Sequence, residues 1–81
     1  MAVWTIKAQY DPEARVWYSI EGDMPGLNVE GDTVDHLAAK ASGMLLDLLE
    51  INADLFPADR LAGSHSIHVV AHDERTFAVA A

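Results

Sequence analysis

The sequence predicts an α+β domain, in which an antiparallel β-sheet has one long α-helix packed on one of its faces. Two patterns support this fold class. Residues 3–10, 16–21 and 65–72 alternate between polar and apolar side chains, whereas residues 34–51 place apolar side chains at helical spacing. The 81 residues are enough for one domain, so residues 1–81 are treated as a single unit.

The segments 3–10 and 16–21 are expected to pair as an antiparallel hairpin. Between them, Pro12 has a φ suited to a turn, and the Asp11 carboxylate can accept hydrogen bonds from the backbone ahead of it. Simple alternation predicts the core-facing side chains of the two strands: Trp4, Ile6, Ala8, Tyr10, Val16, Tyr18 and Ile20. The same alternation places Trp17 on the outer face.

A turn and a short third strand lead into the helix. Pro25-Gly26 suits a type II turn, and residues 27–30 are predicted to be extended. Thr33 is a suitable N-cap for a helix over 34–51, and Asn52 is a suitable end. The apolar stripe expected to face the sheet contains Val34, Leu37, Ala38, Ala41, Met44, Leu45, Leu48 and Ile51.

The remaining chain contributes one further strand. Residues 53–64 are irregular apart from a single helical turn over 58–61, and residues 65–72 then alternate again. The predicted order is therefore β-β-β-α-β. Phe77 and Val79 leave residues 76–81 open as a final strand.

The charge of the chain bears on its partners. Thirteen acidic residues against five basic ones give a formal net charge of −8. Direct nucleic-acid binding is disfavoured, because that affinity comes mostly from Lys and Arg neutralising phosphates, whereas a basic protein partner is favoured. No apolar run approaches the roughly 18 residues of a membrane span, and cysteine is absent. We therefore expect a cytoplasmic protein without a membrane partner.

Several segments in combination resemble one family. Asp11-Pro12-Glu13-Ala14 precedes Val16-Trp17; Asp23-Met24-Pro25-Gly26-Leu27 and Val29-Glu30-Gly31-Asp32-Thr33 then open a helix that ends in Leu48-Leu49-Glu50-Ile51-Asn52. Over residues 3–52, this combination resembles the HicB-like antitoxin superfamily, especially its short stand-alone branch catalogued as a domain of unknown function.

The resemblance implies a degenerate ribonuclease-H-like fold without nuclease carboxylates. It also implies neutralisation of a HicA-type toxin, which is a small basic ribonuclease. Operator binding is not carried over, because full-length HicB antitoxins add a C-terminal helix-turn-helix or ribbon-helix-helix. Residues 53–81 of this chain instead have the patterns of loop and strand.

The predicted function is therefore non-catalytic binding of a small basic toxin, with no cofactor or metal. The candidate partner-binding residues are acidic side chains outside the core and one apolar anchor: Glu21, Asp23, Glu30, Leu46, Asp47 and Glu50. Two alternatives stay open. One is a metal-dependent nuclease or small hydrolase that uses an acidic cluster, and the other is a structural oligomer or small-ligand binder without a toxin. The acidic cluster consists of Glu21, Asp23, Glu30, Asp32 and Asp35.

A thin core also predicts self-association, as a homodimer or a higher even-numbered assembly through the open sheet face or an edge strand. Trp17, with Lys7 and Val70, is the candidate interface on the outer face. The alternative is that Trp17 packs over the aliphatic stem of Lys7 or over the terminal strand.

The histidines of the last strand are expected to be solvated rather than to bind metal. His68 and His72 share one face, but roughly 3.3 Å per residue separates them by about 13 Å. His65 points to the other face.

Overall fold

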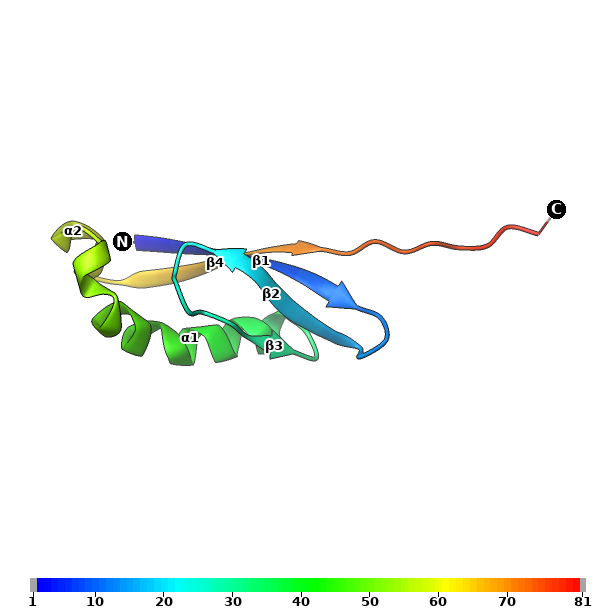
Figure 1. Ribbon diagram of the computed structural model, residues 1–81, viewed down its shortest axis with the longest axis horizontal. Helices are drawn as coiled ribbons and strands as arrows, with labels where there is room; N and C mark the ends of the chain where they lie inside the picture. Colours follow the sequence, from blue (N-terminus) through cyan, green and yellow to red (C-terminus); the bar gives the residue numbers. More distant parts are fainter. Residues whose placement is uncertain (1, 81) are drawn as a thin grey trace.

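The predicted fold class is confirmed by a computed structural model, in which residues 2–80 are described (Figure 1). The strands are β1 (Ala2–Asp11), β2 (Val16–Gly22), β3 (Glu30–Gly31) and β4 (His65–His72). The helical elements are α1 (Val34–Ile51), the 3₁₀ turn η1 (Ala53–Leu55) and α2 (Ala58–Leu61). Both α1 and the single turn α2 lie where the sequence predicts them.

The sheet is mixed rather than antiparallel, which corrects one part of the prediction. Its strand order is β3-β2-β1-β4; β2 is antiparallel to β1 and β3, whereas β4 is parallel to β1. The cause is the length of α1. Its 18 residues run back along the whole sheet, so the chain returns to the end at which β1 starts, and β4 must run in the same direction as β1 (Figure 1).

The core lies between the inner face of the sheet and α1. Trp4, Ile6 and Ala8 of β1 are at most 1% exposed and form its centre. The residues that close over them come from α1 and from the connection between β2 and β3: Leu37, Ala41, Leu45, Leu49, Met24, Leu27 and Val29. Ile67 and Val69 of β4 pack at the margin and are only half-buried.

Helix α1 begins and ends as predicted, but its buried stripe is narrower. The Thr33 hydroxyl accepts the His36 N–H at 3.0 Å, and Asn52 donates to the Leu48 carbonyl at the other end. The fully buried residues follow a single i, i+4 row that includes Leu49, which the predicted stripe omits. Ile51, assigned to the stripe, is 73% exposed. A four-stranded sheet this narrow covers only one row of the helix.

The predicted faces of β2 are wrong, because a β-bulge lies opposite the junction of Lys7 and Ala8. Lys7 pairs with Glu21 but Ala8 pairs with Ser19, so Ile20 is an extra residue and alternation is reversed beyond it. Trp17 therefore pairs with Tyr10 on the core face. Ile20, predicted to be inward, is 51% exposed, and Tyr18 joins the outer face opposite Gln9.

The predicted third strand, 27–30, is displaced toward its C-terminal end. Ser19 explains this, because its side chain replaces a ladder bond: the Val29 N–H donates to Ser19 Oγ at 3.0 Å, while the Ser19 N–H donates to the Val29 carbonyl at 2.9 Å. Regular pairing starts only at Glu30, opposite Tyr18.

The C-terminal residues do not form a strand within the chain. From Asp73 to Ala80 the backbone is extended, every residue is exposed, and the segment projects past the hairpin turn (Figure 1). Position 81 of the predicted strand lies outside the described residues. Hereafter, residues 73–80 are called the tail.

Gly31 is the point at which β3 and α1 approach most closely. A Cβ at Gly31 would lie 2.6 Å from the Leu37 backbone nitrogen, whereas a Cβ at Gly43 would meet nothing within 4 Å. We expect Gly31→Ala to destabilise the fold by about 1–3 kcal/mol. Gly43→Ala should stabilise it by about 0.5–1 kcal/mol, because Gly lowers helix propensity. Urea denaturation of both variants tests this; equal effects would contradict the close approach.

The bulge predicts opposite sensitivities for two neighbours on β2. Trp17→Ala removes a ring that packs on the core and stacks near Tyr10 at 5.3 Å, so it should cost about 2–3 kcal/mol of folding stability. Ile20→Ala should cost less than about 1 kcal/mol, because Ile20 is exposed. Thermal or urea unfolding checks the ratio; the reverse order would restore simple alternation.

Candidate functional site

The candidate acidic residues on β2 are already paired with cations of the same chain. Glu21 lies on the outer face of the sheet, where its carboxylate forms an ion pair with Lys7. The hydrogen bond with Glu21, and then its charge, raise the pKa of Lys7 above its ordinary value. Because both side chains are more than half exposed, water screens this pair. Glu21 is thus less available to an external cation than the sequence suggests.

Asp23 has a structural role at the end of β2. Its carboxylate accepts the Thr5 N–H at 3.0 Å and lies 3.5 Å from the guanidinium of Arg60. Arg60 also donates to the Val3 carbonyl and stacks over the Trp4 ring at 4.1 Å from its centroid. Asp23 and Arg60 therefore connect the start of the β2–β3 connection to α2 across the end of the sheet. Arg60 was not predicted as a site residue, because its partners come from distant parts of the chain.

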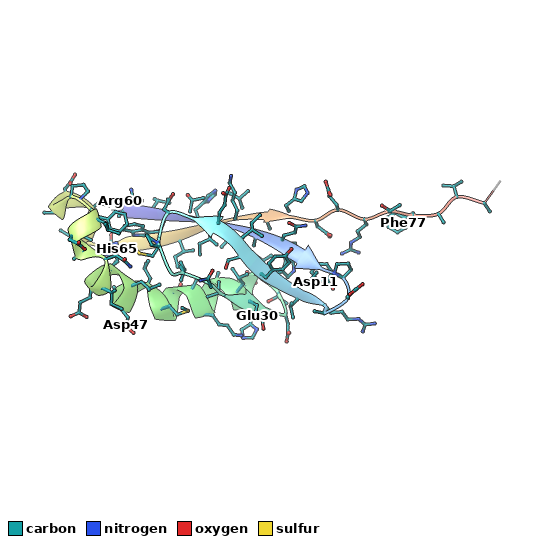
Figure 2. The ribbon with its side chains drawn as sticks, viewed as in Figure 1. Asp11, Glu30, Asp47, Arg60, His65 and Phe77 are labelled. Carbon is teal, nitrogen blue, oxygen red and sulfur yellow. The ribbon has the colours of Figure 1, made fainter. Side chains whose placement is uncertain are left out.

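Glu30 lies apart from the Glu21–Lys7 pair and from the Asp23–Arg60 pair. It is exposed on β3, where it pairs with Tyr18 at the edge of the sheet opposite β4 (Figure 2).

The candidates on α1 form a continuous surface with residues that the sequence analysis did not single out. Leu46, Asp47 and Glu50 are exposed on the side of α1 away from the sheet, where Figure 2 shows Asp47. Residues three and four positions apart are neighbours on a helix, so the surface continues along α1 and into η1. We call this set the acidic–apolar strip: Leu46, Asp47, Glu50, Ile51, Asp54 and Leu55.

The strip combines free charge with exposed apolar area. Leu46, Ile51 and Leu55 are 67%, 73% and 59% exposed. Within residues 2–80, no ion pair involves Asp47, Glu50 or Asp54. The structure therefore divides the six candidates. Leu46, Asp47 and Glu50 gather on the helix layer, and Glu21 lies on the opposite side of the molecule.

The candidate oligomer interface is also divided. Lys7 and Val70 are direct neighbours on the outer face, as predicted. Trp17 is on the core face because of the bulge, so it cannot act with them as an outer-face anchor.

The histidines have separate positions. His68 pairs with Thr5 and His72 with Gln9, which places both on the outer face. His65 is inward, and its Nδ1 accepts the Trp4 indole N–H at 3.1 Å. Across residues 2–80, His, Asp and Glu side chains do not form a group of three that could hold a metal ion.

Hollows in the surface are shallow. One of about 430 Å³ is lined by Ala2, Val3, Pro57, Asp59 and Arg60. Among the described residues that line it, the one cation, Arg60, is already engaged with Asp23, Val3 and Trp4. Within residues 2–80, no helix has both the length and the apolar character needed to cross a membrane.

Comparisons with known proteins place the chain in a family. A family model described as "Domain of unknown function (DUF1902)" matches residues 3–77, and the chain belongs to this family. It is similar to a crystal structure of a hypothetical protein from the extremely thermophilic bacterium Thermus thermophilus. The two share 28% sequence identity and a TM-score of 0.62, over 95% of this chain and 99% of the other. A comparison with curated proteins gave no match.

The bond from Trp4 to His65 predicts a measurable coupling. Trp4 is fully buried, so replacing its acceptor by His65→Leu leaves an indole N–H unsatisfied and should cost about 1–3 kcal/mol of stability. In a Trp4→Phe background the same change should cost about 1 kcal/mol less, because no N–H is left unpaired. Urea unfolding of the four proteins measures the difference. Strictly additive effects would show that the bond contributes nothing.

Proposed function

We propose that this member of the DUF1902 family is a non-catalytic protein-binding domain that acts as HicB antitoxins do, by covering a basic surface of a small toxin ribonuclease. The observation that carries the proposal is the acidic–apolar strip. Among the described residues 2–80, its carboxylates form no ion pair with a cation, and its apolar side chains are exposed next to those carboxylates.

The chemistry of the strip fits a basic partner. Leu46 and Ile51 lie about 140° apart around α1, with Asp47 and Glu50 between them. The carboxylates can therefore meet Lys and Arg at the centre of a contact, while the apolar side chains pack on either side of them. The net charge of −8 would accelerate the encounter and would disfavour acidic competitors. Neutralisation would then be steric and electrostatic, since the bound helix layer would occupy the positive surface on which a ribonuclease holds RNA.

Three of the six partner-binding residues predicted from the sequence are kept in this proposal. Leu46, Asp47 and Glu50 remain partner-binding candidates. Glu21 and Asp23 are assigned structural roles, because Lys7 and Arg60 already engage them. No specific observation favours the nuclease alternative, since Lys7 and Arg60 already engage two acids of the cluster, Glu21 and Asp23.

The test is capture of a partner by the tagged full chain from lysate of its own host, with mass spectrometry of what elutes. We expect a small basic protein that is retained at 0.1 M salt and released at 1 M, as the screening length falls from about 10 Å to about 3 Å. The captured protein should cleave RNA, and the domain should inhibit it. Absence of any basic partner, or magnesium-dependent cleavage by the domain itself, would contradict the proposal.

A matched pair of charge reversals locates the contact. Glu50→Lys lies in the strip, whereas Glu13→Lys makes the same change in the exposed turn between β1 and β2. We expect Glu50→Lys to weaken partner binding about tenfold or more at 0.1 M salt, equivalent to about 1.4 kcal/mol, and Glu13→Lys to change it little. Isothermal titration calorimetry measures both. Equal losses would mean that only total charge matters, and the strip would not be the contact.

A further inference from the structure

Within residues 2–80, the sheet has one long edge without a neighbouring strand. β4 is an end strand in the order β3-β2-β1-β4, and β1 occupies one of its two edges along its whole length of 8 residues. The opposite end of the sheet has only the two residues of β3. A long, unprotected edge is a template for another strand, and folded proteins normally cover it.

The tail has the properties of such a strand. It continues β4 without a turn and projects from the domain in extended form, with Phe77 near its middle (Figures 1 and 2). Phe77 is 78% exposed and Val79 is 91% exposed. Because side chains alternate along an extended chain, both point to the same face as Ile67 and Val69 of β4. These two β4 residues are only half-buried, so the core is incomplete where β4 ends the sheet.

We infer that the tail of each chain adds an antiparallel strand to the free edge of β4 in a second copy. Residues 74–80 of the tail are enough to lie opposite residues 66–72 of β4, so two copies related by a twofold axis near Asp73 would each cover most of the other's edge. Each sheet would then have the order β3-β2-β1-β4 followed by the partner's tail. The inference is independent of the proposed toxin-binding function.

The side chains favour one register. With the axis at Asp73, the inner face brings Val69 against the partner's Phe77 and Ile67 against the partner's Val79. On the outer face, His72 lies opposite the partner's Glu74, and within each chain His72 Nε2 already lies 3.1 Å from Glu74 Oε1. A register centred on His72 places Ile67 against the partner's Phe77, but Val69 against the partner's Arg75 and His65 against the partner's Val79, so it has one such apolar contact where the first register has two.

One like-charge contact accompanies this register, because the two Asp73 side chains meet at the axis. Arg75 offsets it, since its guanidinium lies 2.9 Å from the Asp73 carboxylate of the same chain. The hydrogen bond with Asp73 raises the pKa of Arg75 above its ordinary value, so the compensating charge is permanent. A second copy suits the edge better than an unrelated peptide, because the same chain supplies both the open edge and an extended segment whose exposed Phe77 and Val79 match the inner face of β4.

The first test is the mass of the purified full chain in solution, by sedimentation equilibrium. The chain is 8.8 kDa, and we expect a species of twice this mass. Phe77→Asp should raise the dimer dissociation constant about 100-fold or more, because it places a charge in the core of the joint sheet. Ala78→Asp adds the same charge to the other face of the tail and should raise it less than about tenfold.

Circular dichroism of both variants should show a folded chain, which separates loss of the dimer from loss of folding. A monomeric wild-type chain would overturn the inference, as would a dimer that Phe77→Asp leaves intact.

The second test fixes the register, and the absence of cysteine makes it clean. In the double variant Val70→Cys/Thr76→Cys, each thiol lies opposite a thiol of the partner, and oxidation should give a covalent dimer. Within one chain the two positions are about 20 Å apart at roughly 3.3 Å per residue, which is too far for a disulfide. The control, Val70→Cys alone, should stay unlinked. Failure of the double variant to cross-link, or equal cross-linking of the control, would contradict this pairing.

Discussion

The structure depends on the burial of one face of β1. Trp4, Ile6 and Ala8 are sealed between the sheet and α1, while β2 and β4 occupy the two edges of the same strand. β1 therefore has its backbone hydrogen-bonded on both sides and one face removed from water. The other elements can be understood as covers for it. α1 supplies an i, i+4 row of apolar side chains, and the β2–β3 connection adds Met24, Leu27 and Val29.

Because the inner face of β1 is buried, the polar group that Trp4 carries there needs a partner within the protein. The buried Trp4 indole needs an acceptor, which His65 supplies from the start of β4. Arg60 covers the ring and reaches Asp23, so α2 is held to the end of the sheet by the same tryptophan. Asp23, which resembles a partner-binding residue by sign and exposure, thus belongs to the support of the core. The acidic–apolar strip consists of side chains on the helix layer that take no part in these contacts.

Much of this fold follows from local patterns, and the errors arise from longer-range effects. Periodicity and capping predict α1 from Thr33 to Asn52, because both are encoded within a few residues. The bulge could not be predicted by alternation, since Ile20 looks like a normal inward residue of β2. It reverses Trp17, and with it the basis for an outer-face anchor. The parallel pairing of β4 depends on the direction in which α1 returns, and no single segment encodes that direction.

The candidate site likewise contains residues that local patterns predict and residues whose roles depend on contacts with distant segments. Exposure of Leu46, Asp47 and Glu50 follows from the helical period, and the structure brings them together with Ile51, Asp54 and Leu55. That Glu21 and Asp23 are engaged by Lys7 and Arg60 depends on pairing across strands and on a contact with α2. The significance of the tail likewise appears only in three dimensions, when its length and face are compared with the open edge of β4.

β1 organises one sheet, and we infer that the open edge of β4 is completed by the tail of a second copy. Amide hydrogen exchange of the unmodified chain, read residue by residue, tests it most directly. We expect the slowest exchange in β1 and α1. We also expect residues 76–80 to become protected as the protein concentration rises and the dimer forms. Exchange of residues 76–80 at the rate of an unstructured peptide at every concentration would contradict it.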